Sequence, residues 1–180
     1  MSTHVAFLRG MNLGNRRIKN DELRSIFEKL GFAEAATFRA SGNVIFKVED
    51  AGSEEVLAER IEAGLGEELG YEVPVFLRSG AEVRGIATLE PFDPKLVESS
   101  GGKLQVSLLR KAPGAKVRRE VLAMATEEDL LAIEGRELYW LPSGGMLDSG
   151  LNLQAIDALV GADTRRTMGT IEQIAAKHLA

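Results

Sequence analysis

Residues 9–19 hold the side chains best suited to binding an anion. This segment mixes cations with glycine and asparagine: Arg9, Gly10, Asn12, Gly14, Asn15, Arg16, Arg17 and Lys19. Glycines let backbone N–H groups approach an oxyanion, arginine binds phosphate through two parallel hydrogen bonds, and a helix N-terminus adds a positive dipole end. Neither Gly-x-x-x-x-Gly-Lys-Ser/Thr nor Gly-x-Gly-x-x-Gly is present. The segment predicts either an anion site of no standard type or an ordinary connection whose glycines supply positive φ.

Two further places supply candidate ligand residues. Ser41-Gly42-Asn43 is typical of a tight turn, in which glycine and asparagine serve the backbone. A ligand role for this turn requires that it lie beside the segment that starts at Arg9. Arg166 follows Arg165 just before an expected helix, where it either completes an anion site or pairs with an acid. The expected ligand-binding residues are Arg9, Gly10, Asn12, Gly14, Lys19, Ser41, Asn43 and Arg166.

The residue sets of common catalytic mechanisms are absent from the sequence. There is no cysteine, and His4 and His178 show no His-x-x-x-His or carboxylate spacing that fits a metal. No Gly-x-Ser-x-Gly motif marks a nucleophile, so Ser143 and Ser149 are interpreted as loop residues. We therefore name no catalytic residue and expect neither a metal nor a cofactor.

Charge is distributed unevenly along the chain. The net charge is −5, yet residues 1–48 hold eight Lys or Arg against four acids, a balance of +4 that leaves −9 for the rest. A basic region on an acidic protein attracts anions locally, and the alternative is a chance sum of scattered surface charges. No apolar run approaches the ~20 residues that cross a bilayer, and the first residues lack a signal-peptide pattern. The absence of cysteine fits a reducing cytoplasm, which is the location we expect.

The apolar pattern of the first half predicts the order β-α-β-β-α-β. Strands are expected at residues 4–8, 37–39, 44–48 and 73–77. One helix is expected to begin with Asn20 as N-cap and to end before Gly31, and a second to begin after Ser53. The buried stripe of the first helix is Leu23, Ile26, Phe27 and Leu30.

The second half repeats the order β-α-β-β-α. After a short helix at 81–89, the expected elements are a strand at 104–108, a helix at 116–125, a hairpin from 130–133 to 137–141, and helices at 153–160 and 170–179. Adjacent strands joined by tight turns are antiparallel, so a parallel Rossmann sheet is not favoured. The pattern predicts an α+β protein of two ferredoxin-like (split β-α-β) subdomains with antiparallel sheets and C-terminal helices, divided into residues 1–80 and 81–180.

The order of several short motifs resembles the N-terminal signature of a bacterial family. They are Phe7-Leu8-Arg9-Gly10-Met11-Asn12-Leu13-Gly14, Ile18-Lys19, Leu23-Arg24, Leu30-Gly31-Phe32 and Ser41-Gly42-Asn43-Val44. This set resembles the family known as domain of unknown function 1697. Residues 138–149 and 164–170 resemble later family segments, although Thr167 stands where the family has asparagine and Met168 where it has tryptophan. The resemblance implies two ferredoxin-like subdomains and carries no activity.

Three functions follow from these observations as hypotheses. The first is a binding protein for a phosphate-bearing small molecule or nucleotide at the basic segment. The second is a single-stranded RNA-binding module, which is not favoured because aromatics are few, the pI is about 5.2, and Phe7 and Phe46 are expected in the core. The third is an enzyme acting on a small anionic substrate oriented by Asn12, Ser41 or Asn43. No membrane partner is expected, and the oligomeric state stays open.

Overall fold

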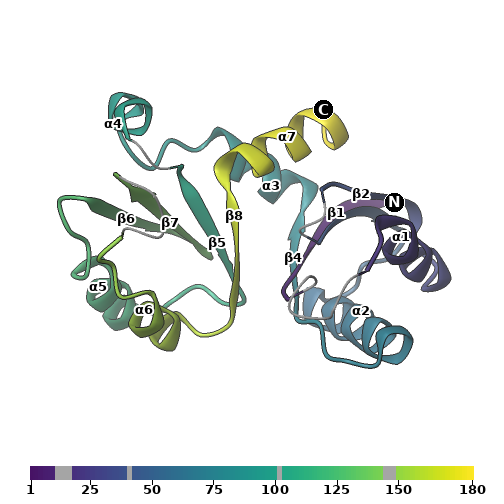
Figure 1. Cartoon of the computed structure of the whole chain (residues 1–180). Helices are drawn as coiled ribbons and strands as arrows, with labels where there is room; N and C mark the ends of the chain where they lie inside the picture. Colours follow the sequence, from purple (N-terminus) through teal and green to yellow (C-terminus); the bar gives the residue numbers. More distant parts are fainter. Residues whose placement is uncertain (11–17, 40–41, 101–102, 144–148) are drawn as a thin grey trace. The chain divides into compact units, whose positions relative to one another are not determined.

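The computed structural model describes residues 1–10, 18–39, 42–100, 103–143 and 149–180. It divides into a first unit, Met1–Gly85 with Ile174–Ala180, and a second unit, Ile86–Gln173 (Figure 1). Each unit contains a four-stranded sheet whose strands pair antiparallel, so the chain is an α+β protein. The sequence-based division at residue 80 stays a prediction.

The first unit follows the order β-α-β-β-α-β. Its elements are β1 (Ser2–Leu8), α1 (Asn20–Lys29), β2 (Ala33–Thr37), β3 (Asn43–Val48), α2 (Glu54–Leu69) and β4 (Val75–Ser79). The strands lie in the order β2-β3-β1-β4. The strand expected at 37–39 therefore ends at Thr37, two residues before the expected end, because Phe38 and Arg39 already belong to the turn into β3.

Helices α1 and α2 cover one face of this sheet. Leu23, Ile26 and Phe27 form the buried stripe of α1 that their spacing predicts, whereas the fourth expected member, Leu30, is half-buried and follows the helix as its C-cap. In α2 the Ser53 hydroxyl accepts a hydrogen bond from the backbone N–H of Val56 at 3.2 Å, as an N-cap residue does. The expected cap of α1 is wrong by one residue: the helix begins at Asn20 and the cap position falls on Lys19, whose side chain makes no capping hydrogen bond.

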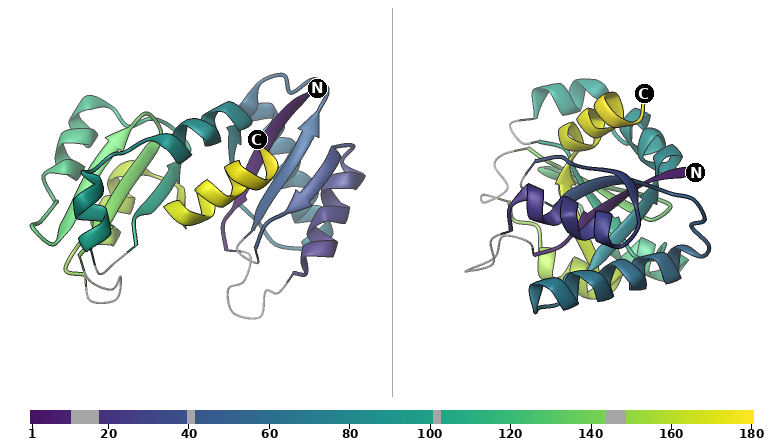
Figure 2. Two further views of the ribbon diagram at one scale, coloured as in Figure 1. Left: turned by 90° about the horizontal axis from the view of Figure 1, so that it is seen from above. Right: turned by 90° about the vertical axis from the view of Figure 1, so that its right-hand side faces the viewer.

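The opposite face of the sheet meets the end of the C-terminal helix α7 (Met168–His178), on the other side from α1 (Figure 2). Arg84, in α3 (Gly80–Thr88), donates from Nη1 to the carbonyl oxygen of Leu179 at 3.2 Å. Gly80 lies so close that a Cβ there would stand 3.3 Å from Cδ2 of Leu179. The last turn of α7 is therefore anchored on the first unit.

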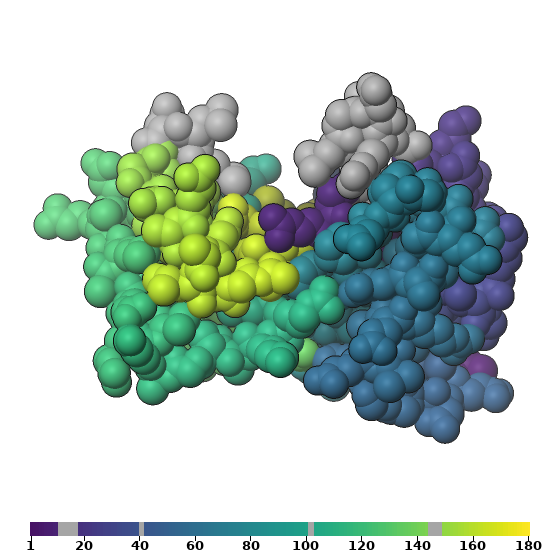
Figure 3. Space-filling model, turned by 90° about the horizontal axis from the view of Figure 1, so that it is seen from below, coloured from purple at the N-terminus to yellow at the C-terminus, as the bar shows by residue number. Residues whose placement is uncertain are grey.

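The second unit begins with α4 and then follows the same order as the first. Its elements are α4 (Pro94–Ser99), β5 (Gln105–Leu109), α5 (Ala115–Leu122), β6 (Asp129–Glu134), β7 (Glu137–Pro142), α6 (Leu153–Val160) and β8 (Asp163–Thr167). Their strand order, β6-β7-β5-β8, corresponds position by position to β2-β3-β1-β4. Helices α5 and α6 cover one face, and Figure 3 shows their outer surface in green and yellow-green.

Strand β8 was not predicted from the sequence. Residues 163–167 were expected to lead directly into a helix, with Arg165 and Arg166 before it, yet Asp163–Thr167 pairs with β5 along its length. The strand carries no large apolar side chain, so it lacks the alternation that marks a half-buried strand. The pattern of apolar residues therefore could not predict this strand.

Candidate functional site

The ends of β1 and β2 define one edge of the first sheet. Both strands pair antiparallel with β3, so they run in the same direction and end together where β3 begins. Because neighbouring strands are about 4.8 Å apart, the two ends lie roughly 10 Å apart with β3 between them. Arg9 follows β1, Arg39 follows β2, and Lys19 precedes α1, which leaves from this edge.

The turn at Gly42 and Asn43 lies directly beside the end of β1. The backbone N–H of Leu8 donates to the carbonyl oxygen of Gly42 at 2.8 Å. Asn43 is 0 % exposed, and its Nδ2 donates to the carbonyl oxygen of Phe38 at 2.9 Å. The amide of Asn43 therefore closes the turn, and the turn meets the condition that a ligand role requires, since it lies beside Arg9.

Three of the described residues at this edge have left-handed backbone. Gly10 has φ 73°, Gly42 has φ 81°, and Arg39 has φ 60°. For a residue with a side chain this conformation costs about 1–2 kcal/mol. Arg39 is one of two non-glycine residues with positive φ in the described part of the chain. Such strain gathers at functional sites, so Arg39 is a candidate that the sequence analysis did not name.

Three basic side chains lie against the ring of Phe38. The guanidinium carbon of Arg39 lies 5.4 Å from the ring centroid, and Nζ of Lys177 lies 5.5 Å from it. The ring of His178 meets it edge-on with centroids 6.2 Å apart. Lys177 and His178 are exposed, whereas Phe38 is only 9 % exposed. The β2 side of the edge is therefore cationic.

The β4 side of the edge has the opposite charge. The backbone N–H of Arg9 donates to the carbonyl oxygen of Pro74 at 3.1 Å, which ties the end of β1 to the start of β4. Pro74 also borders a groove whose lining carries four carboxylates: Glu59, Glu62, Glu67 and Glu72. An anion at this edge is thus favoured between the ends of β1 and β2, away from β4.

The described residues of the expected ligand set fall in two places. Arg9, Gly10, Lys19 and Asn43 share the edge of the first sheet, with Arg9 and Lys19 exposed. Arg166 belongs to β8 of the second unit. The remaining expected residues, Asn12, Gly14 and Ser41, lie outside the described residues.

Arg166 is a buried cation bonded to its own strand. It is 7 % exposed, and its Nη1 donates to Oγ1 of Thr164 and to the carbonyl oxygen of Arg165, both at 2.8 Å. Burial lowers the pKa of Arg166 from 12.5 to about 10, which still leaves it charged at neutral pH. A ligand role for Arg166 stays a prediction.

The second unit reproduces the backbone contacts of this edge. The N–H of Leu109, at the end of β5, donates to the carbonyl oxygen of Arg136 at 2.9 Å, as Leu8 does to Gly42. The N–H of Arg110 donates to the carbonyl oxygen of Ala162 at 3.3 Å, as Arg9 does to Pro74. Arg110 is therefore the positional counterpart of Arg9.

Comparison with known proteins identifies the family. The family model described as protein of unknown function DUF1697 matches residues 1–139. The chain belongs to the DUF1697 family. No curated protein matches this DUF1697 chain. A solved structure, conserved bacterial protein SP0830 from Streptococcus pneumoniae, is similar with a TM-score of 0.79 and 16 % identity, covering 100 % of this chain and 99 % of that one. At that identity the likeness shows a shared fold alone.

In this DUF1697 protein Thr167 caps α7. Thr167 stands where asparagine was expected, and its Oγ1 accepts a hydrogen bond from the backbone N–H of Thr170 at 3.2 Å at the start of α7. Asparagine and threonine are both favoured N-cap residues, so either residue type can cap a helix at this position.

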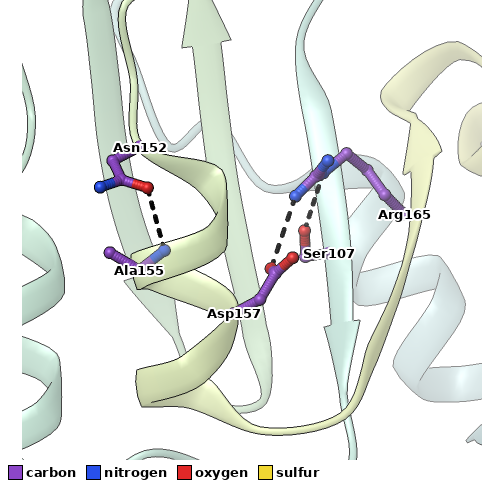
Figure 4. Close-up of polar contacts among 5 residues, drawn as sticks. All are labelled: Ser107, Asn152, Ala155, Asp157 and Arg165. Carbon is purple, nitrogen blue, oxygen red and sulfur yellow. Dashed lines mark hydrogen bonds and ion pairs between the residues drawn. The ribbon is translucent and has the colours of Figure 1, made fainter.

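The second unit also holds a polar cluster around Arg165 (Figure 4). Its Nε donates to Oγ of Ser107 at 3.2 Å, its Nη2 lies 4.0 Å from Oδ1 of Asp157, and its guanidinium lies 5.4 Å from the ring centroid of Trp140. Asn152 caps α6 nearby by accepting from the N–H of Ala155 at 3.1 Å. Arg165 thus links β8, β5, α6 and β7, which explains it as a structural residue.

Asp129 is the centre of a second buried network. Its Oδ1 accepts hydrogen bonds from Nε1 of Trp140 at 2.9 Å and from Oγ of Ser149 at 2.7 Å. Ser149 in turn accepts from the N–H of Leu151 at 3.1 Å. These bonds support the interpretation of Ser149 as a loop residue.

No group of three His, Cys, Asp or Glu side chains among the described residues could hold a metal ion. In the same ranges no helix combines the length and apolarity that a membrane crossing requires.

Proposed function

We propose that this DUF1697 protein binds a phosphate-bearing small molecule or nucleotide at the edge formed by the ends of β1 and β2. The observation that supports this best is the hydrogen bond from Leu8 to Gly42, which sets the turn before β3 against the residues that follow β1. Arg9 on one side and Arg39 on the other then flank the turn. A ligand with phosphate oxygens suits this pair because guanidinium groups bind phosphate through charge-assisted hydrogen bonds.

The backbone supports the same ligand class. Gly10 and Gly42 carry no Cβ, so a phosphate oxygen can approach their backbone closely. Lys19 stands at the N-terminal end of α1, where the helix dipole is positive and an anion is stabilised. Binding without catalysis is the simplest function of this edge, because none of its described residues is arranged as a nucleophile with a base.

The fold class proposed for both units is ferredoxin-like. Its support is the β-α-β-β-α-β order of each unit together with the strand orders β2-β3-β1-β4 and β6-β7-β5-β8. A cytoplasmic location in a bacterium is proposed on the absence of cysteine and on the family resemblance. RNA binding gains no support from the aromatics named for it, since Phe7 and Phe46 are both 0 % exposed and cannot stack on a base.

Thermal unfolding with a ligand panel tests the binding function. Wild type, Arg9→Ala and the matched control Arg110→Ala are unfolded with inorganic phosphate, pyrophosphate, sugar phosphates, nucleotides and short RNA. A ligand at 100 times its dissociation constant adds about 2.7 kcal/mol, which raises the midpoint of a chain this size by roughly 5–10 °C. The rise is expected in wild type and Arg110→Ala and not in Arg9→Ala.

The controls separate binding from folding. Arg9→Ala must keep the wild-type circular dichroism spectrum and midpoint without ligand, since Arg9 is exposed. If no phosphate-bearing compound shifts the wild-type midpoint, the proposed function is wrong. If only RNA shifts it, with a steep loss at higher salt, the RNA-binding module replaces it. Incubating any ligand found with the protein then shows whether it is turned over.

A further inference from the structure

Building on the proposed function, we propose that the C-terminal helix completes the site with Lys177 and that the ligand carries at least two linked phosphoryl groups. A nucleoside diphosphate or another pyrophosphate-bearing compound has the required chemistry. Lys177 stands more than 130 residues from the other site residues in the sequence, yet it lies over the ring of Phe38 because the last turn of α7 belongs to the first unit.

Phe38 fixes where Lys177 stands relative to Arg39. The two cations lie 5.5 and 5.4 Å from the same ring centroid, so their charges are no more than about 11 Å apart. Phe38 follows β2, and its N–H donates to the carbonyl oxygen of Asn43 at 3.0 Å, in the turn that Arg9 flanks from the other side. Lys177 therefore adds a second cation to the β2 side of the edge, and the strand order places β2 farthest from β4 and the carboxylates that border it.

The end of α7 is held firmly enough to position a binding residue. Leu179 is buried, and its carbonyl oxygen accepts the hydrogen bond from Arg84 in α3. Its side chain packs at Gly80, and the ring of His178 meets Phe38. Lys177, between these contacts and the preceding turn, is exposed and makes no ion pair within the described parts of the chain.

The number of cations favours a diphosphate over a single phosphate. Two cations on one ring repel each other, and an anion between them removes that repulsion. A monophosphate carries about −1.5 to −2 charges at neutral pH, which is less than the combined charge of Arg9, Arg39 and Lys177. Two linked phosphoryl groups offer these three cations more negative charge and more acceptor oxygens.

Titration calorimetry of the full chain with inorganic phosphate and pyrophosphate tests this assignment. The variants are Lys177→Gln, the matched control Lys111→Gln on the surface of the second unit, and Arg9→Ala. Pyrophosphate is expected to bind wild type at least about tenfold more tightly than phosphate. Lys177→Gln is expected to weaken pyrophosphate binding by roughly three- to fivefold, as for one exposed charge contact, and to leave phosphate binding within about twofold of wild type.

The outcomes distinguish this inference from the proposed function. If Arg9→Ala weakens both anions while Lys177→Gln behaves like Lys111→Gln, the edge binds phosphate without the helix and the inference is overturned. Equal affinity of wild type for phosphate and pyrophosphate also overturns it. If neither anion nor any phosphate-bearing compound binds wild type, the proposed function fails and the inference falls with it.

Discussion

Removal of the Asp129 carboxylate is expected to destabilise the second unit strongly. Asp129 is 1 % exposed and accepts hydrogen bonds from Trp140 and Ser149 on one oxygen. In Asp129→Ala the buried indole N–H of Trp140 loses its acceptor, which costs about 1–3 kcal/mol. The lost bond to Ser149 and the small cavity add roughly 1 kcal/mol, so we expect a total near 3 kcal/mol. Asp129→Asn keeps one acceptor oxygen and should lose only about 1 kcal/mol.

The chain offers its own probe for this measurement. Trp140 is the single tryptophan and lies in the second unit, so its fluorescence during urea unfolding follows that unit, while circular dichroism follows both. A loss of 3 kcal/mol corresponds to a fall of roughly 6–12 °C in the thermal midpoint for a chain of this size.

A double-mutant cycle isolates the hydrogen bond itself. Trp140→Phe removes the donor, and its combination with Asp129→Ala should be less destabilising than the two changes summed, with a coupling of about 1–2 kcal/mol. The reasoning is refuted if Asp129→Ala unfolds within about 1 kcal/mol of wild type. A coupling close to zero would show that the carboxylate and the indole do not act together.

Two other changes test smaller features. Gly85→Ala, in α3 with nothing within 4 Å of the added Cβ, should stabilise by about 0.5–1 kcal/mol through helix propensity; Gly64→Ala should gain less, because its Cβ would stand 2.7 Å from Cδ2 of Leu30. Urea unfolding measures the free energy of unfolding of both variants. An equal stability gain in the two would contradict the packing argument. Arg165→Ala should lose about 1–2 kcal/mol with its hydrogen bond and its contact with Trp140; unchanged Trp140 emission and stability would contradict it.

The elements that hydrophobic spacing can mark were predictable from the sequence. The stripe of α1 and the hairpin through Gly135 appear where expected, because each buries one apolar face. Strand β8 was missed since its sequence, Asp-Thr-Arg-Arg-Thr, is polar on both faces and gains its place by pairing with β5. Arg165 of this strand donates a hydrogen bond to Ser107 of β5, and a polar contact of this kind leaves no periodic pattern in the sequence.

The candidate site was only partly visible in the sequence. Arg9 and the turn at Asn43 could be named from their types, and the register of β1 with β3 brings them together. Arg39 was missed because its significance lies in a left-handed backbone, which residue type does not predict for arginine. Lys177 was missed because its place depends on the packing of the chain's last turn, through Leu179, on a distant segment.

The repeated topology makes the number of bound anions informative. Leu109 and Arg110 make the same backbone hydrogen bonds in the second unit as Leu8 and Arg9 make in the first. The backbone arrangement at the strand ends is therefore common to both units. What the first unit adds is the cationic group around Phe38. If that group decides binding, calorimetry should give one pyrophosphate per chain, lost in Arg9→Ala and retained in Arg110→Ala. Two pyrophosphates per chain, one lost in each variant, would instead mean that the strand ends suffice and that the cations on Phe38 are dispensable.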